Sequence, residues 1–261
     1  MVVFPNCKIN LGLRIINKRS DGYHELETLM YPVPYYDILE VMDADQFQFT
    51  QTGSTVAGSM EDNICVKAYR LMVEKHAIPP VSIHLHKQLP MGAGMGGGSA
   101  DATFTLKVIN DLLALNLSVE QLQEYSAELG SDCPFFVKDV PQLATGRGEI
   151  LEDISLDLKG YFLVLIHPAI HISTAEAFRG VHISGKSGES KEISTLPVEN
   201  WKGVMKNDFE NHIFENHPEL AAVKSQLYES GAIYASMTGS GSVVYGLFKD
   251  RPNGFTTVIE L

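Results

Sequence analysis

Cysteine is scarce in this chain, which has three among its 261 residues. Cys7, Cys65 and Cys133 are odd in number, widely spaced and form no Cys-x-x-Cys pair. This spacing argues against a disulfide framework or a zinc site and suits a reducing compartment. Long hydrophobic runs are also missing: the longest aliphatic-aromatic run, residues 161–166, is far too short to span a bilayer. With no signal-peptide core at the N-terminus, we expect a cytoplasmic protein with no membrane partner.

Positive charge is the second scarcity. The chain has 20 Lys and Arg against 32 Asp and Glu, a formal net charge of −12. That balance argues against binding to nucleic acid or to an anionic membrane surface. Residues 1–20 are the exception, because they contain Lys8, Arg14, Lys18 and Arg19 and no acidic residue. A locally cationic segment suits an anionic ligand, although chance composition explains it equally well.

Glycine, in contrast, is concentrated in one place. Residues 90–99 read Pro-Met-Gly-Ala-Gly-Met-Gly-Gly-Gly-Ser, between a strand-like run at 81–85 and a helical run at 102–115. The amides and the dipole at the start of a helix attract phosphate, and glycine lets the backbone approach it. The pattern therefore predicts a nucleotide phosphate loop, with a positive φ expected at Gly97. A purely structural glycine turn is the simpler alternative.

The standard phosphate-loop templates fit poorly. Residues 92–97 satisfy Gly-x-Gly-x-x-Gly, but a dinucleotide site needs a strand after the helix. Here a second helix is indicated, because Ser118 and Gln121 form a capping-box pattern and Gly130 is a helix stop. No Lys-Ser or Lys-Thr follows the last glycine, so this is not a Walker loop either.

Strand and helix patterns both occur along the rest of the chain, whose length allows one large domain or two modest ones. We expect an α+β protein with two domains, residues 1–150 and 151–261. A turn is expected at Asp21-Gly22 and a helix from about residue 63 to 76. Residues 142–148 are interpreted as a crossover between the halves, and 184–195 as a mobile surface loop. Asp208 and Glu210 are interpreted as surface or capping residues.

Two residues could carry phosphoryl-transfer chemistry. A phosphate loop without a Walker lysine needs another cation, and Lys8 is a candidate. Asp132, just after the Gly130 helix stop, could accept a proton from a substrate hydroxyl or orient it. An ordinary turn carboxylate is the alternative for Asp132. His84 and His86 alternate on one strand, but no third ligand is placed by spacing, so no metal site is expected.

Three separated segments resemble the GHMP family, named for galactokinase, homoserine kinase, mevalonate kinase and phosphomevalonate kinase. They are residues 8–10 (Lys-Ile-Asn), 90–99 and 237–242 (Met-Thr-Gly-Ser-Gly-Ser). The strings at 21–24 (Asp-Gly-Tyr-His) and 130–136 (Gly-Ser-Asp-Cys-Pro-Phe-Phe) resemble the branch of that family that acts on a cytidine-diphosphate ester of methylerythritol. The resemblance runs in family order from about residue 4 to residue 248.

This resemblance implies an N-terminal domain like the second domain of ribosomal protein S5 and a ferredoxin-like C-terminal domain, with the active site in the cleft between them. It implies transfer of the γ-phosphoryl group of ATP, with Mg²⁺ carried by ATP, to the 2-hydroxyl of the methylerythritol moiety in the non-mevalonate isoprenoid pathway. The expected partners are these small molecules, and the expected state is a monomer or weak homodimer.

The resemblance also assigns residues to roles. Lys8 and Asp132 match the catalytic pair. The positions matching the ATP site are Pro90, Met91, Gly92, Ala93, Gly94, Met95, Gly96, Gly97, Gly98, Ser99 and, near the adenine, Asn63. Those matching the substrate site are Asn10, Tyr23, His24, Thr174 and Phe178, with Tyr23 and Phe178 as walls of a cytosine slot. The chain departs from many relatives at Ala100, where they have a second serine, and at Ala93, a frequent glycine that alanine can replace if φ is negative.

Three rival functions stay open. A sister kinase acting on mevalonate or homoserine would share the phosphate loop but lack the Tyr23-His24 string. A dinucleotide-binding oxidoreductase would need the missing strand–helix–strand unit. A non-catalytic RNA-binding module on an S5-like fold would need a basic face, which the net charge of −12 opposes.

Overall fold

The computed structural model describes residues 1–54, 58–181, 183, 185 and 187–261. By its contacts the chain divides into two compact units, each built from separate segments. Unit 1 consists of residues 1–7, 35–91 and 96–140, and unit 2 of residues 8–34, 92–95 and 141–261. The chain therefore passes between the units repeatedly. A domain boundary at residue 150 stays a prediction.

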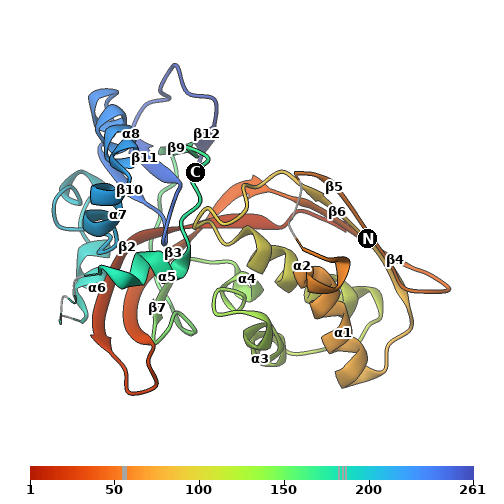
Figure 1. Cartoon of the computed structure of the whole chain (residues 1–261). Helices are drawn as coiled ribbons and strands as arrows, with labels where there is room; N and C mark the ends of the chain where they lie inside the picture. The colour runs from red at the N-terminus through yellow and green to blue at the C-terminus, as the bar shows by residue number, and fades with distance from the viewer. Residues whose placement is uncertain (55–57, 182, 184, 186) are drawn as a thin grey trace. The chain divides into compact units, whose positions relative to one another are not determined.

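Unit 1 is a four-stranded sheet with helices packed on one side of it (Figure 1). The strand order is β1-β4-β6-β5, with β5 parallel to β6 and the other pairs antiparallel. Its strands are β1 (Val2–Val3), β4 (Ile38–Asp43), β5 (Gln48–Gly53) and β6 (Val81–Lys87). Its helices are η1 (Met60–Asp62), α1 (Ile64–His76), α2 (Gly97–Leu112), α3 (Val119–Leu129) and α4 (Phe135–Lys138).

Strand β6 shows why one face of this sheet is buried and the other is partly exposed to solvent. Its residues alternate strictly between buried and half-exposed along the strand. Val81, Ile83 and Leu85 enter the core of unit 1, where Leu106 and Ile109 of α2 also lie. Because side chains in a strand alternate between the two faces, the next inward position falls on Lys87, which is buried as well.

Side-chain caps define the starts of helices α1 and α3 in unit 1. The side chain of Asn63 accepts a hydrogen bond of 2.9 Å from the amide of Cys65 at the start of α1. Ser118 and Gln121 form a reciprocal capping box at the start of α3, as their spacing predicts. Both satisfy amides that would otherwise lack partners in the first helical turn.

Unit 2 contains two four-stranded sheets, ordered β2-β3-β7-β8 and β10-β11-β9-β12. The strands are β2 (Asn6–Lys18), β3 (His24–Tyr36), β7 (Gln142–Thr145), β8 (Ile150–Asp153), β9 (Phe162–Ile166), β10 (Tyr234–Met237), β11 (Val244–Phe248) and β12 (Val258–Glu260). The helices are α5 (Thr174–Arg179), α6 (Glu189–Ser194), η2 (Val198–Asn200), α7 (Glu210–Asn216) and α8 (Pro218–Glu229). Helix α8 packs on β10 and β11.

The turn between β2 and β3 confirms the prediction at Asp21-Gly22. Gly22 has a φ of +87°, a conformation that favours glycine. The amide of Arg19 donates to the carbonyl of Tyr23 at 2.8 Å, and the amide of Tyr23 donates to the Asp21 carboxylate at 3.1 Å. That amide, with the Arg19 guanidinium, lowers the pKa of Asp21.

Two loop predictions are wrong. Residues 142–148 are not a crossover, because β7 pairs antiparallel with β3 and continues through a turn into β8. Of residues 184–195, positions 184 and 186 lie outside the described residues, and 189–194 form helix α6. The Glu27 carboxylate anchors the start of this helix by accepting hydrogen bonds from the amides of Gly188 at 2.6 Å and Ser190 at 2.8 Å.

Both units combine helices with strands, which confirms the α+β prediction. Among the residues that the structure describes, no helix combines the length and the apolar composition needed to cross a lipid bilayer.

The core of unit 1 makes a direct stability prediction. Leu106 is fully buried, so Leu106→Ala removes packed methyl groups and should lower the free energy of unfolding by about 2–5 kcal/mol. Urea unfolding measures this, with Val73→Ala on the exposed face of α1 as the control. Equal losses for the two variants would contradict the described core.

Candidate active site

The glycine-rich loop leads directly into helix α2. Gly92, Gly94 and Gly96 have φ values of +61°, +78° and +68°. Gly96 is the N-cap of α2 and has no side chain to satisfy the first helical amides. The loop thus has the backbone that the phosphate-loop prediction requires.

Of two predictions about the backbone of this loop, the one at Gly97 is wrong and the one at Ala93 agrees with the structure. The expected positive φ at Gly97 is wrong, because this residue is the first of helix α2. A Cβ there would lie 3.2 Å from Nζ of Lys87 and 3.3 Å from Cβ of Leu89, so close packing explains the glycine. Ala93 is not among the residues with positive φ, which agrees with its replacing a glycine.

In unit 2 the loop is tied to residues 237–242. A Cβ on Gly94 would overlap the carbonyl oxygen of Thr238, so only glycine fits there. The Thr238 hydroxyl donates to the carbonyl of Gly94 at 2.9 Å. The amide of Val243 donates to the carbonyl of Ala93 at 3.3 Å. These contacts fix residues 93–94 against residues 237–242, which we call the late loop.

Lys8 and Asn10 lie at the same place in unit 2. Lys8 is 3% exposed, and its Nζ donates to Asn10 Oδ1 at 2.5 Å and to the carbonyl of Gly94 at 3.3 Å. The side-chain Nδ2 of Asn10 donates to the hydroxyl of Thr28 at 3.1 Å. The backbone amide of Asn10 donates to the hydroxyl of Thr238 at 3.0 Å. The structure therefore brings together Lys8, Asn10 and Gly94, three of the residues predicted from the sequence.

Asp132 belongs to unit 1, in the turn that follows α3. The hydroxyl of Thr103, on α2, donates to the carbonyl of Cys133 at 2.8 Å and so ties this turn to the helix. Burial raises the pKa of the Cys133 thiol to about 11; the nearby Ser99 side chain opposes the rise and the Asp132 carboxylate adds to it. Asp132 thus lies beside a neutral thiol that also contacts the first turn of α2.

Unit 1 also holds a buried charge cluster. The ammonium of Lys87 bonds to the carboxylate of Asp37 and, at 2.7 Å, to Asp101 Oδ2, and each side chain is at most 2% exposed. The other oxygen of Asp37 accepts from the amides of Gln88 at 2.6 Å and Leu89 at 2.8 Å. We call Asp37, Lys87 and Asp101 the buried triad. It joins α2 to the segment that enters the glycine loop.

The buried triad has one ammonium for two carboxylates. Burial raises the pKa of Asp101 to about 7, although Lys87 pulls it down. Burial lowers the pKa of Lys87, but the two carboxylates outweigh it and leave a net rise. Asp101 Oδ1 is buried and has no hydrogen-bond partner among the described residues. The triad is therefore able to take up a proton near neutral pH.

An aromatic cluster contains two of the predicted substrate residues, His24 and Phe178. The rings of His24 and Phe178 stack with centroids 4.7 Å apart and planes 19° apart, while Phe209 meets Phe178 edge-on at 4.9 Å. Tyr23 is 57% exposed, and the centroid of its ring lies 5.0 Å from Cζ of Arg147. Burial, with a smaller contribution from Lys18, lowers the pKa of His24 and favours its neutral form. His24 and Phe178 are thus together, and Tyr23 is available at the surface.

Two predicted site residues have local structural roles. Asn63, the N-cap of α1, also donates from Nδ2 to Gln51 Oε1 at 3.2 Å. Thr174 is exposed and begins α5 directly after its N-cap, Ser173. Their assignments to the ATP and substrate sites stay predictions.

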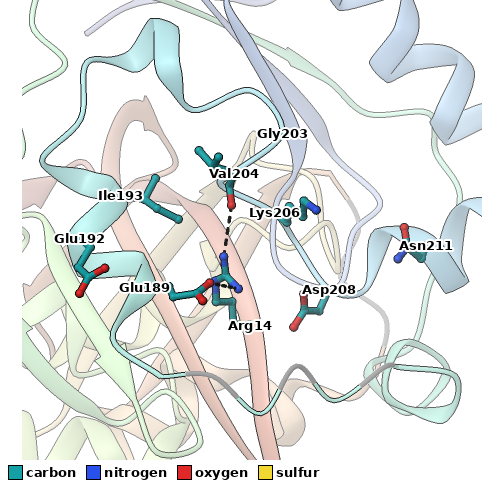
Figure 2. A pocket seen from close by; sticks show the side chains of 9 residues that line it. All are labelled: Arg14, Glu189, Glu192, Ile193, Gly203, Val204, Lys206, Asp208 and Asn211. Atoms are coloured by element: carbon teal, nitrogen blue, oxygen red, sulfur yellow. Dashed lines mark hydrogen bonds and ion pairs between the residues drawn. The ribbon is translucent and has the colours of Figure 1, made fainter.

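A cavity of about 620 Å³ in unit 2 is separate from these predicted residues (Figure 2). Its lining residues are Arg14, Glu189, Glu192, Ile193, Gly203, Val204, Lys206, Asp208 and Asn211. Arg14 bonds to Glu189 at 2.6 Å and to the carbonyl of Val204 at 3.3 Å. No residue predicted for catalysis or binding lines it.

Comparison with known proteins identifies the family. Residues 63–139 match the family model "GHMP kinases N terminal domain", and residues 193–254 match "GHMP kinases C terminal". The chain is 47% identical over 255 residues to a 4-diphosphocytidyl-2-C-methyl-D-erythritol kinase of Parabacteroides distasonis, covering 98% of this chain and 94% of that one. The chain belongs to the GHMP kinases. A relative with the same name from Azobacteroides pseudotrichonymphae is 49% identical and covers 97% of this chain and 96% of its own.

Solved structures of GHMP kinases have the same fold. A crystal structure of 4-(cytidine 5'-diphospho)-2C-methyl-D-erythritol kinase matches with a TM-score of 0.79 and 30% identity, covering 95% of this chain and 90% of that one. The mevalonate kinase of Methanococcus jannaschii matches with a TM-score of 0.72, the same two coverages and 14% identity, which shows the fold alone. The predicted GHMP fold is confirmed.

The sequence interpretation missed the buried triad and the bonding role of Thr238. The alternation Val81-Ile83-Leu85, extended by two residues, points Lys87 into the core and could have indicated a buried charge in need of partners. Nothing local indicates that Asp37 and Asp101 are those partners, because they lie 50 and 14 positions away in the sequence.

The buried triad predicts how stability depends on pH. With a native pKa of about 7 against its ordinary value of 3.8, Asp101 keeps a proton that the unfolded chain has released. Its contribution to the free energy of unfolding should therefore fall as pH rises from about 4 to 7, by at most about 1.4 kcal/mol per pH unit. Asp101→Asn removes this titration, so urea unfolding between pH 5 and 8 should show a flatter profile than the wild type. Asp111→Asn, an exposed change on the same helix, should leave the slope unchanged; parallel profiles for wild type and Asp101→Asn would contradict the prediction.

Proposed function

We propose that this GHMP kinase transfers the γ-phosphoryl group of ATP to the 2-hydroxyl of 4-diphosphocytidyl-2-C-methyl-D-erythritol, a step of the non-mevalonate isoprenoid pathway. The observation that carries the proposal is the identity of 47–49% over nearly the whole chain to kinases named for that substrate. The contact of Lys8 with the glycine loop supports it, because such a loop needs a cation.

The chemistry asks the protein mainly for positioning and electrostatic stabilisation. In this proposal the amides of the glycine loop and the start of α2 hold the phosphates of ATP. Lys8, fixed by Asn10 and Gly94, stabilises the negative charge on the transferred group. Asp132 accepts the proton of the attacking hydroxyl or orients that hydroxyl.

We propose that Mg²⁺ arrives with ATP as part of the substrate. Ser99, in the first turn of α2, supplies a hydroxyl there, whereas Ala100 supplies none. Ser99 or water must therefore serve where relatives have a second serine. A cytoplasmic location and a monomeric or weakly dimeric state also stay predictions.

The aromatic cluster is the proposed cytosine site. In the structure His24 covers a face of Phe178. We infer that the cytosine ring replaces His24 against Phe178, with Tyr23 on its other face and the neutral imidazole able to hydrogen-bond to the edge of the base. Asn10 and Thr174 are proposed to contact the rest of this substrate.

Catalytic roles for Lys8 and Asp132 are tested by two variants. Asp132→Asn keeps the side-chain size and loses the charge, so kcat should fall about 100-fold or more while both KM values stay within about threefold. Lys8→Met should behave similarly. Steady-state ADP production with the cytidyl substrate measures this. Near wild-type kcat for Asp132→Asn would remove it from catalysis, and a defect of Lys8→Met confined to the KM for ATP would make Lys8 a binding residue.

Recognition of cytosine is tested separately. A stacked base–aromatic pair contributes about 1–3 kcal/mol, so Tyr23→Ala should raise the KM for the cytidyl substrate about tenfold or more. The KM for ATP should stay unchanged, and weak phosphorylation of free methylerythritol should not alter. Tyr36→Ala, another exposed tyrosine of the same hairpin, is the control. A rise in the KM for ATP instead would place Tyr23 at the adenine.

A further inference from the structure

Residues 206–210 form buried hydrogen bonds that the sequence does not suggest. Glu210, predicted at the surface or as a cap, is only 8% exposed. Its Oε1 accepts hydrogen bonds from the amide of Met237 at 2.8 Å and the hydroxyl of Ser236 at 2.9 Å, and its Oε2 pairs with Lys224 at 2.5 Å. The surface assignment is therefore wrong for Glu210. Its carboxylate holds the end of β10, where the late loop begins.

The same segment runs beside strand β2. The amide of Leu13 donates to the carbonyl of Lys206, and the amide of Asp208 donates to the carbonyl of Leu13, both at 2.8 Å. Lys206 and Asp208 line the cavity in Figure 2. Asn207, between them, is 3% exposed and contacts residues 237 and 239 instead.

The side-chain amide of Asn207 makes three of its four possible hydrogen bonds, two as a donor and one as an acceptor. Its Nδ2 donates to the carbonyls of Met237 and Gly239, each at 2.8 Å. Its Oδ1 accepts from the amide of Phe209 at 3.0 Å. Because both donors and the acceptor oxygen of this buried amide are engaged, its orientation is fixed, and Asn207 holds the two residues that flank Thr238.

Thr238 passes that constraint to the candidate active site. Its hydroxyl contacts the Gly94 carbonyl, the Asn10 amide and, at 3.3 Å, Asn10 Oδ1. The Lys8 ammonium donates to the same two oxygens, the Gly94 carbonyl and Asn10 Oδ1. Asn207 thus bonds to the residues on either side of Thr238, Thr238 bonds to Asn10 and Gly94, and these two bond to Lys8. All of these residues belong to unit 2.

We propose that Asn207 is a positioning residue of the kinase reaction, which sets the Lys8 ammonium and the Gly94 carbonyl through Thr238. The inference rests on the proposed phosphoryl transfer. Asn207 contacts neither substrate in this account. Its loss displaces a charge that matters most in the transition state, so it lowers kcat more than it raises either KM.

The test is a double-mutant cycle in the full-length chain, read as ADP production with ATP and the cytidyl substrate. Asn207→Ala should lower kcat about tenfold or more and leave the KM for the cytidyl substrate within about threefold. Asn211→Ala, an exposed asparagine that lines the cavity in Figure 2, should keep kcat within about twofold. Urea unfolding identifies the conditions in which every variant is folded.

Combination with Lys8→Met separates positioning from general weakening of the fold. If Asn207 acts through Lys8, Asn207→Ala should reduce kcat by no more than about threefold further in the Lys8→Met background. Losses that multiply, or a single-variant kcat within about twofold of the wild type, would overturn the proposal.

Two milder variants cover a failure of Asn207→Ala to fold. Asn207→Asp keeps the volume and the Oδ1 acceptor but replaces the two donors, and Thr238→Val removes only the hydroxyl. Each should show the same non-additivity with Lys8→Met, and additive losses in both would overturn the proposal. If the wild type phosphorylates a different alcohol, the proposed substrate is wrong, and the same cycle run with that acceptor still tests Asn207.

Discussion

The ammonium group of Lys87 is the charge on which the arrangement of unit 1 depends. An ion removed from water must be paired, and Lys87 takes its partners from the residue before β4 and from helix α2. Asp37 uses its second oxygen for the amides of Gln88 and Leu89. The sheet, the start of α2 and the entry to the glycine loop therefore share one electrostatic requirement. Such a cluster adds little net stability, but it disfavours arrangements that leave the lysine unpaired.

Features set by neighbours in the sequence were predictable. The capping box at Ser118 and Gln121, the turn at Gly22 and the glycine loop before α2 all depend on residues a few positions apart. Features set by distant partners were not. Helix α6 is anchored by Glu27, about 160 positions away, and Glu210 is buried because it bonds to the amide of Met237. The composition of residues 184–195 favours a surface loop, and Glu210 was expected at the surface or as a capping residue.

The candidate site divides in the same way. Family strings identified Lys8, Asn10 and the glycine loop, and the structure joins them through hydrogen bonds. The same strings contain Thr238 without revealing that its hydroxyl bonds to Gly94, since 144 positions separate the two. Asn207 lies in no string that the sequence singled out. Residues proposed to contact substrates are recognisable by residue type and motif. Residues that position those side chains are recognisable only from contacts in the folded structure.

The interleaving of the two units bears on how the chain is made. Unit 1 is complete once residue 140 has been synthesised, whereas unit 2 needs residues 8–34 together with residues 141–261. Strand β3 must therefore wait for β7, its neighbour in the sheet, until most of the chain has emerged from the ribosome. Pairing of this kind closes long loops and is slow to form. A fragment beginning at residue 151 would lack three of the four strands of that sheet, so the second half cannot be cut out as a finished folding unit.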